Sequence, residues 1–135
     1  MTANDIETRS DIELLMRAFY QRAMADEVIG VHFEELDLES HLPVMVDFWE
    51  KALFGKPVYF NNPLAVHQRL NERQPMVSSH FRRWVELFIA AVDELFAGAT
   101  ADSAKATARI VADSLDQRLN PDLRFDGIDI AAALR

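Results

Sequence analysis

Four polar aromatic side chains in this chain of 135 residues have the chemistry to hold a metal-centred cofactor and to contact its ligand. His67 stands in a short apolar segment, and a neutral imidazole on an apolar helix is a good ligand for iron or another borderline metal. Tyr20, His41 and Trp84 each stand beside an apolar stripe and offer hydrogen-bonding groups. If the four converge on one cavity, a flat apolar cofactor with an iron centre fits this set.

The same residues also have ordinary structural interpretations. Taken alone, His67 is more often a partly buried histidine whose ring is satisfied by a backbone carbonyl. Tyr20 is then a boundary tyrosine with its hydroxyl in water, and Trp84 is a core residue. The other sequence patterns of the chain decide between these interpretations.

Several other chemistries are excluded by residue types and patterns that are missing. The chain has no cysteine, which removes disulfides, thiolate zinc sites, iron–sulfur clusters, thiol catalysis and covalent haem attachment through Cys-x-x-Cys-His. The four histidines do not follow the Glu-x-x-His pattern of di-iron bundles. His-Glu-x-x-His, Gly-rich phosphate loops and Gly-x-Ser-x-Gly are also absent from the sequence. An enzyme built on a nucleophile or on two acidic groups therefore has no support.

Charge and hydropathy limit the partners that we expect. The formal net charge is −8, and no run of basic residues is longer than Arg82-Arg83, which argues against nucleic acid. No apolar run approaches the roughly 18 residues needed to span a bilayer. No secretory signal pattern is visible either, so we expect a cytoplasmic protein without membrane insertion. We expect a single domain over residues 1–135, with a core at about 11–119 and a C-terminal tail at 120–135.

The elements that must position these side chains are predicted to be helices. Ser10-x-x-Glu13 matches a capping box, and apolar residues at three- and four-residue spacing then predict a helix to about Asp26, after a frayed segment 1–9. A 3.6-residue period continues in the second helix, which carries His41.

The start of the second helix has two alternatives. Either Ser40 or Asp37 caps it. If Ser40 is the cap, Pro43 lies in the first turn, where its missing N–H costs little. If the helix starts at Asp37, Pro43 should kink it. Gly55 is expected to end this helix.

The second half of the chain predicts one very short helix and two long ones. The short helix spans Leu64–Leu70 and needs a packing partner, because two turns are not stable alone. The strongest periodicity in the chain runs from about Met76 to Phe96, with Gly98 placed to end it. Thr100 is expected to cap the last helix, which Asn120-Pro121 stops. No strand pattern is present, so we predict an all-α protein.

Several short motifs resemble truncated haemoglobins, and among these the third group is most similar. They run in family order over residues 12–119, and they include Phe19-Tyr20, Ile29-Gly30-Val31-His32-Phe33, His41, Asp47-Phe48-Trp49, Pro63-Leu64-x-x-His67, His80-Phe81-x-x-Trp84 and Leu87-Phe88. The resemblance implies a globin-like two-over-two helical sandwich around a non-covalent b-type haem. It implies His67 as the proximal iron ligand, with Tyr20, His41 and Trp84 on the distal side. Further haem-contacting residues implied by it are Phe33, Met45, Phe48, Leu64, Trp84 and Phe88.

The function implied by the resemblance is reversible binding of dioxygen, NO or CO, as in oxygen transport, by a monomer or weak oligomer served by an unidentified reductase. A redox enzyme at the same haem, peroxidase-like or NO dioxygenase-like, is the first alternative. A haem-free acidic helical interaction module is the second. His32 and His80 are expected at the surface or beside the haem propionates.

Overall fold

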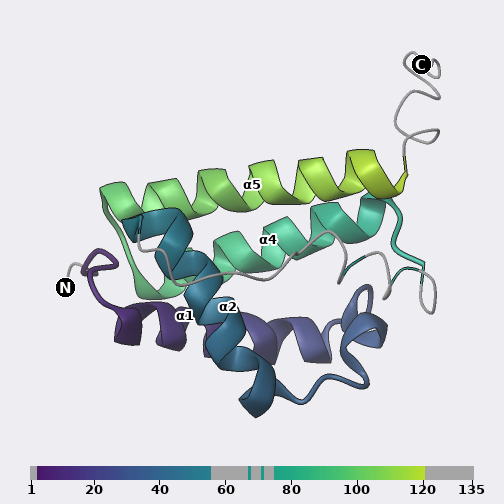
Figure 1. Ribbon diagram of the computed structural model, residues 1–135, viewed down its shortest axis with the longest axis horizontal. Helices are drawn as coiled ribbons and strands as arrows, with labels where there is room; N and C mark the ends of the chain where they lie inside the picture. Colours follow the sequence, from purple (N-terminus) through teal and green to yellow (C-terminus); the bar gives the residue numbers. More distant parts are fainter. Residues whose placement is uncertain (1–2, 56–66, 68–70, 72–74, 121–135) are drawn as a thin grey trace.

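Figure 1 shows the computed structural model, which describes residues 3–55, 67, 71 and 75–120. The helices that it describes, in chain order, are α1 (Arg9–Ala25), the 3-10 helix η1 (Gly30–Phe33), α2 (Leu38–Phe54), α4 (Ser78–Leu95) and α5 (Ala99–Leu119). His67 and Asn71 are also helical. Leu64 and the predicted tail from 121 onward lie outside the described residues. The described part has no strand, which confirms the all-α prediction.

The helices pair into two layers. Helix α4 lies alongside α5, and α1 packs against α2, which crosses it steeply (Figure 1). Contacts of α1 with α4 and of α2 with α5 join the two pairs. The predicted two-over-two helical sandwich is therefore confirmed. Within the part of the chain that the structure describes, no helix is long and apolar enough to cross a membrane.

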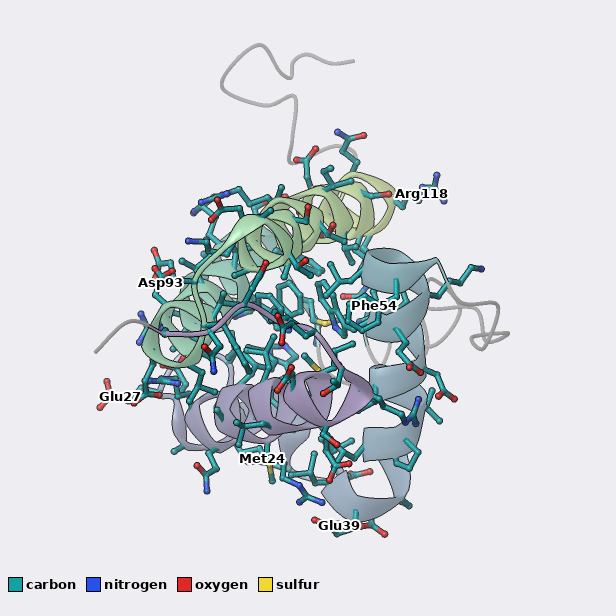
Figure 2. The ribbon with its side chains drawn as sticks, turned by 90° about the vertical axis from the view of Figure 1, so that its left-hand side faces the viewer. Met24, Glu27, Glu39, Phe54, Asp93 and Arg118 are labelled. Atoms are coloured by element: carbon teal, nitrogen blue, oxygen red, sulfur yellow. The ribbon has the colours of Figure 1, made fainter. Side chains whose placement is uncertain are left out.

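The core lies between the two layers. Figure 2 shows side chains filling the space between α1 and the α4–α5 pair, whereas the labelled Glu27, Asp93 and Arg118 point outward. On α5 the buried stripe consists largely of small residues, namely Ala101, Ala104, Ala108 and Ala112. Small residues at this spacing let α5 approach α4 closely, so larger side chains of the other helices fill the centre.

The N-terminal segment is part of the core, which contradicts the prediction that residues 1–9 are frayed. Ile6 is 1% exposed. The Asp5 carboxylate accepts hydrogen bonds from the backbone N–H groups of Thr100 (2.9 Å) and Ala101 (2.8 Å). Asp5 thereby caps α5, whereas Thr100 was the predicted cap. Gly98 begins α5 with φ +141° and does not end α4, which was the predicted role.

Two predicted helix starts are also corrected by the structure. Helix α1 is capped by Thr8, which forms the capping box with Asp11, two residues before the predicted Ser10 pair. Helix α2 begins after Asp37, whose side chain makes no capping hydrogen bond, and Pro43 therefore lies inside the helix. Proline has no N–H, so it cannot donate to the carbonyl of Glu39. The predicted helix ends at Gly55 and Asn120 are confirmed.

Candidate functional site

Three of the predicted site residues contact one phenylalanine, Phe19, and a fourth contacts one of those three. The ring centroid of Phe19 lies 4.8 Å from that of Tyr20 and 5.5 Å from those of Trp84 and Phe88, each in an edge-to-face arrangement. Phe33 of η1 lies 5.7 Å from Tyr20, again edge-on. Helices α1 and α4 and the turn η1 thus bring together side chains that are far apart in sequence.

A second set of ring contacts extends this cluster to α2. Phe88 is fully buried and stacks on Trp49 (4.8 Å, 18°) and on Trp84 (5.5 Å, 16°). Sequence analysis did not single out Phe19 or Trp49 as site residues. The apolar periodicity of their helices marked both as buried, but it could not show which rings they touch.

The Tyr20 hydroxyl is the clearest polar feature of the cluster. Tyr20 is 8% exposed, and among the residues that the structure describes its hydroxyl has no hydrogen-bond partner. Burial raises the pKa of this phenol well above its usual value, so the group stays a neutral donor. A buried hydroxyl without a partner costs about 1–3 kcal/mol, so native proteins rarely keep one without a reason.

The indole N–H of Trp84 adds a second donor. Trp84 is half-buried between Phe19 and Phe88, and its N–H has no hydrogen-bond partner in the described ranges. Both donors therefore belong to one aromatic cluster, on α1 and α4. Each of the two groups can donate a hydrogen bond to a small ligand that carries partial negative charge.

His67 lies in a helical turn and is half-buried, which agrees with the predicted short helix. Its side chain has an interaction within the protein, and its role as a metal ligand stays a prediction. Most of its immediate neighbours along the chain lie outside the described residues.

The remaining predicted residues, Met45, Phe48 and His41, lie on α2 and differ in how exposed they are. Met45 and Phe48 are half-buried and pack against the core cluster that contains Tyr20. His41 is exposed on the first turn of α2, and no hydrogen bond joins its ring to Tyr20 or Trp84 in the described part of the chain. Its distal role also stays a prediction.

His32 is buried, which contradicts its predicted place at the surface, whereas a place beside a propionate stays a prediction. It is 9% exposed, and its Nε2 donates to the carbonyl oxygen of Pro75 at 3.0 Å. Its ring lies 4.7 Å from that of His80. The Nδ1 atom of His80 accepts the N–H of Val77 at 3.0 Å, which fixes the first turn of α4. Burial, followed by the charge on His32, lowers the pKa of His80.

An ion pair ties the end of α1 to α4 next to Trp84. Arg83 donates from Nε (3.0 Å) and Nη2 (2.7 Å) to Oδ1 of Asp26. The other oxygen of Asp26 accepts the backbone N–H groups of Val28 and Ile29 at 3.0 and 3.1 Å. One buried carboxylate therefore sets the relative positions of α1, the turn that leads to Phe33, and α4.

Comparison with known proteins identifies the fold. No protein-family model and no curated protein matches the sequence. The crystal structure of a group III truncated haemoglobin from Campylobacter jejuni matches with a TM-score of 0.76 and 22% identity, over 88% of this chain and 95% of that chain. The likeness spans almost the whole of both chains, and it agrees with the resemblance that the short motifs indicated. The chain therefore has the fold of a group III truncated haemoglobin.

Proposed function

We propose that this protein is a haem protein that reversibly binds dioxygen or another diatomic gas, NO or CO, at a non-covalent b-type haem. The observation that carries the proposal is the buried Tyr20 hydroxyl, which has no partner among the described residues and lies in the same cluster as the Trp84 N–H. A site for a partly negative ligand explains why two donors remain unpaired in an apolar cluster. The fold supports the same conclusion.

In this proposal His67 is the proximal ligand. A neutral imidazole on a half-buried helical turn suits an iron that needs one protein donor. Haem, when bound, supplies an iron atom with an open position for the gas. Phe33, Met45, Phe48, Leu64 and Phe88 would form the apolar wall that keeps water away from it.

The distal residues would act as hydrogen-bond donors. The Tyr20 hydroxyl and the Trp84 indole N–H would donate to the bound gas, and the dry surroundings strengthen both bonds. His41 lies on a turn of α2 whose residue Leu42 belongs to the same cluster, and its imidazole would be a third distal group. A separate reductase would keep the iron ferrous.

The test is the visible absorption spectrum of purified protein supplied with haemin, in the ferric, reduced and CO-treated forms. We expect a Soret band that shifts with CO. His67→Ala should lose stable haem binding, whereas His41→Ala, which removes the same group from an exposed position, should keep it. An unchanged spectrum of His67→Ala would contradict the assignment of the proximal ligand. A protein that stays colourless with haemin would favour a haem-free interaction module.

A further inference from the structure

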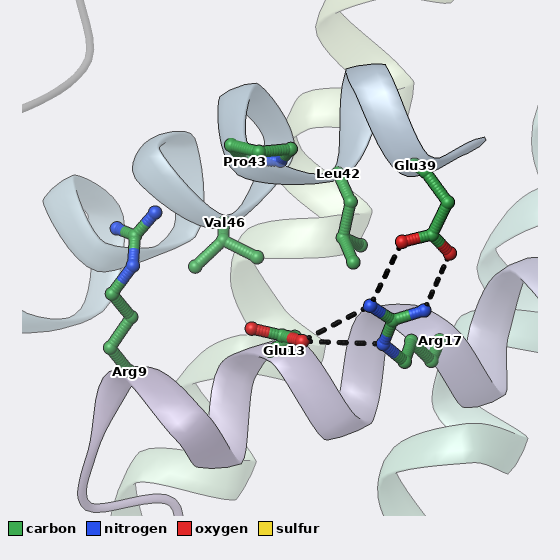
Figure 3. A pocket seen from close by; sticks show the side chains of 7 residues that line it. All are labelled: Arg9, Glu13, Arg17, Glu39, Leu42, Pro43 and Val46. Carbon is green, nitrogen blue, oxygen red and sulfur yellow. Dashed lines mark hydrogen bonds and ion pairs between the residues drawn. The ribbon is translucent and has the colours of Figure 1, made fainter. Parts of the chain in front are cut away.

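A pocket of about 140 Å³ lies between α1 and α2 on the outer side of the core (Figure 3). It is lined by Arg9, Glu13, Arg17, Glu39, Leu42, Pro43 and Val46. Its apolar residues Leu42 and Val46 are buried in the cluster that also contains Tyr20. At the floor of the pocket, therefore, Leu42 and Val46 are the side chains that stand between the pocket and the core cluster.

Arg17 bridges the two helices at this pocket. Its guanidinium donates to both oxygens of Glu39, from Nη1 at 2.8 Å and from Nη2 at 3.2 Å. It also donates to one oxygen of Glu13, at 3.3 and 3.2 Å. Figure 3 shows the guanidinium between the two carboxylates. Glu13 belongs to the same helix as Arg17, so of these two carboxylates only Glu39 joins α1 to the first turn of α2.

The first turn of α2, residues 38–42, is weakly joined to the rest of its helix. Pro43 removes the hydrogen bond that the Glu39 carbonyl would accept, and Asp37 makes no side-chain cap. The N–H of His41 donates to the Asp37 carbonyl at 3.1 Å, so the turn itself remains formed. Because this backbone hydrogen bond is missing from the helix at Pro43, residues 38–42 can move as a unit relative to the rest of α2.

The body of α2 beyond Pro43 is held to α1 by a different ion pair. Arg9 donates to Asp47 at 2.8 Å and to Glu50 at 2.6 Å, and the Glu50 side chain is only 6% exposed. The Glu39 side chain, by contrast, is 71% exposed. The two arginines are similarly exposed, at 44% and 43%, so the difference lies in the carboxylates. A buried carboxylate holds α2 on one side of Pro43, and an exposed, more salt-sensitive carboxylate holds it on the other.

We propose that the first turn of α2 is a lid over the ligand-binding cluster, with Pro43 as its hinge and the Arg17–Glu39 ion pair as its latch. The inference rests on the proposed function. When the turn swings out, Leu42 leaves the cluster that contains Tyr20, and a small gas gains a path to it. When the latch closes, Leu42 seals the cluster and His41 is held near the rim. An exposed pair shifts such an equilibrium by about 1.4- to 5-fold.

Two charge-matched variants test the latch. Glu39→Gln and Glu13→Gln each remove one negative charge that pairs with Arg17, but only Glu39→Gln weakens the ion pair between the two helices. We expect Glu39→Gln to speed CO association after flash photolysis by about 1.4- to 5-fold, with Glu13→Gln close to wild type. Raising the salt concentration should speed the wild type and leave Glu39→Gln unchanged. Pro43→Ala, which restores the missing N–H, should slow association.

Amide hydrogen exchange in the haem-free protein gives a second measurement that does not depend on gas binding. The amides of His41 and Leu42, the first that bond back within this turn, should exchange faster in Glu39→Gln than in Glu13→Gln, and more slowly in Pro43→Ala. Equal exchange and equal CO rates in the two glutamine variants would overturn the lid. A missing Soret band would instead refute the proposed function, and the exchange rates would still show whether the latch and hinge exist.

Discussion

Replacing Tyr20 by phenylalanine should have opposite effects on the haem-free protein and on its gas complex. The substitution removes one hydroxyl and almost no volume from a site that is 8% exposed. In the haem-free protein that hydroxyl has no partner among the described residues, so its removal breaks no hydrogen bond with them. In the gas complex the same hydroxyl is the proposed donor to the ligand.

The gain in stability of the haem-free protein and the loss in stability of the gas complex are similar in size. Removal of an unsatisfied buried hydroxyl should raise the free energy of unfolding by about 1 kcal/mol. With a urea slope of about 1.5 kcal/mol/M, the unfolding midpoint rises by about 0.7 M. Loss of a hydrogen bond to the ligand costs about 1–3 kcal/mol, which speeds dioxygen release by about 5- to 150-fold.

Urea unfolding of the haem-free protein and stopped-flow dioxygen release from the reduced holoprotein measure the two effects on one variant. A lower urea midpoint in Tyr20→Phe would show that the hydroxyl is satisfied within the protein, which would refute the reasoning from burial. An unchanged release rate beside a higher midpoint would show that the hydroxyl does not reach the ligand.

Three further predictions concern stability. Gly98→Ala should destabilise the protein by about 1–3 kcal/mol in urea unfolding, because φ there is +141° and the new Cβ would lie 2.5 Å from Cγ of Asp5; a variant as stable as the wild type would contradict this. Burial and the neighbouring imidazole lower the pKa of His80, so just below pH 6.5 the unfolded chain binds more protons than the folded one. The free energy of unfolding should therefore fall as the pH drops through that range. His80→Gln should lose this pH dependence. Arg83 lowers the pKa of Asp26 below 3.8, so this carboxylate stabilises the fold above that pH, and its contribution is lost on further acidification. Asp26→Asn should therefore be less stable than the wild type at pH 7, and its stability should change less with acid.

Local patterns in the sequence were sufficient to predict that the long helices exist, although not where each of them begins. The apolar stripes of α1, α4 and α5 repeat at 3.6 residues, and this period by itself places Phe19, Trp84 and Phe88 on buried faces. The ends of α2 and α5 were equally predictable. Gly55 takes φ +71°, which suits glycine, and a proline follows Asn120 and cannot continue a helix. These features depend on residues within one or two turns of each other.

Contacts between residues far apart in the sequence determined the features that the local patterns did not predict. Asp5 caps a helix that begins 94 residues later, and the segment predicted to be frayed is buried as a result. His32 can be buried because the carbonyl oxygen of Pro75 accepts a hydrogen bond from its ring N–H. Whether the hydroxyl of Tyr20 finds a partner likewise depends on every helix packed around it. Periodicity states which face of a helix is apolar, but hydrogen bonds and ring contacts between helices exist only once those faces have met, so only the tertiary structure determines them.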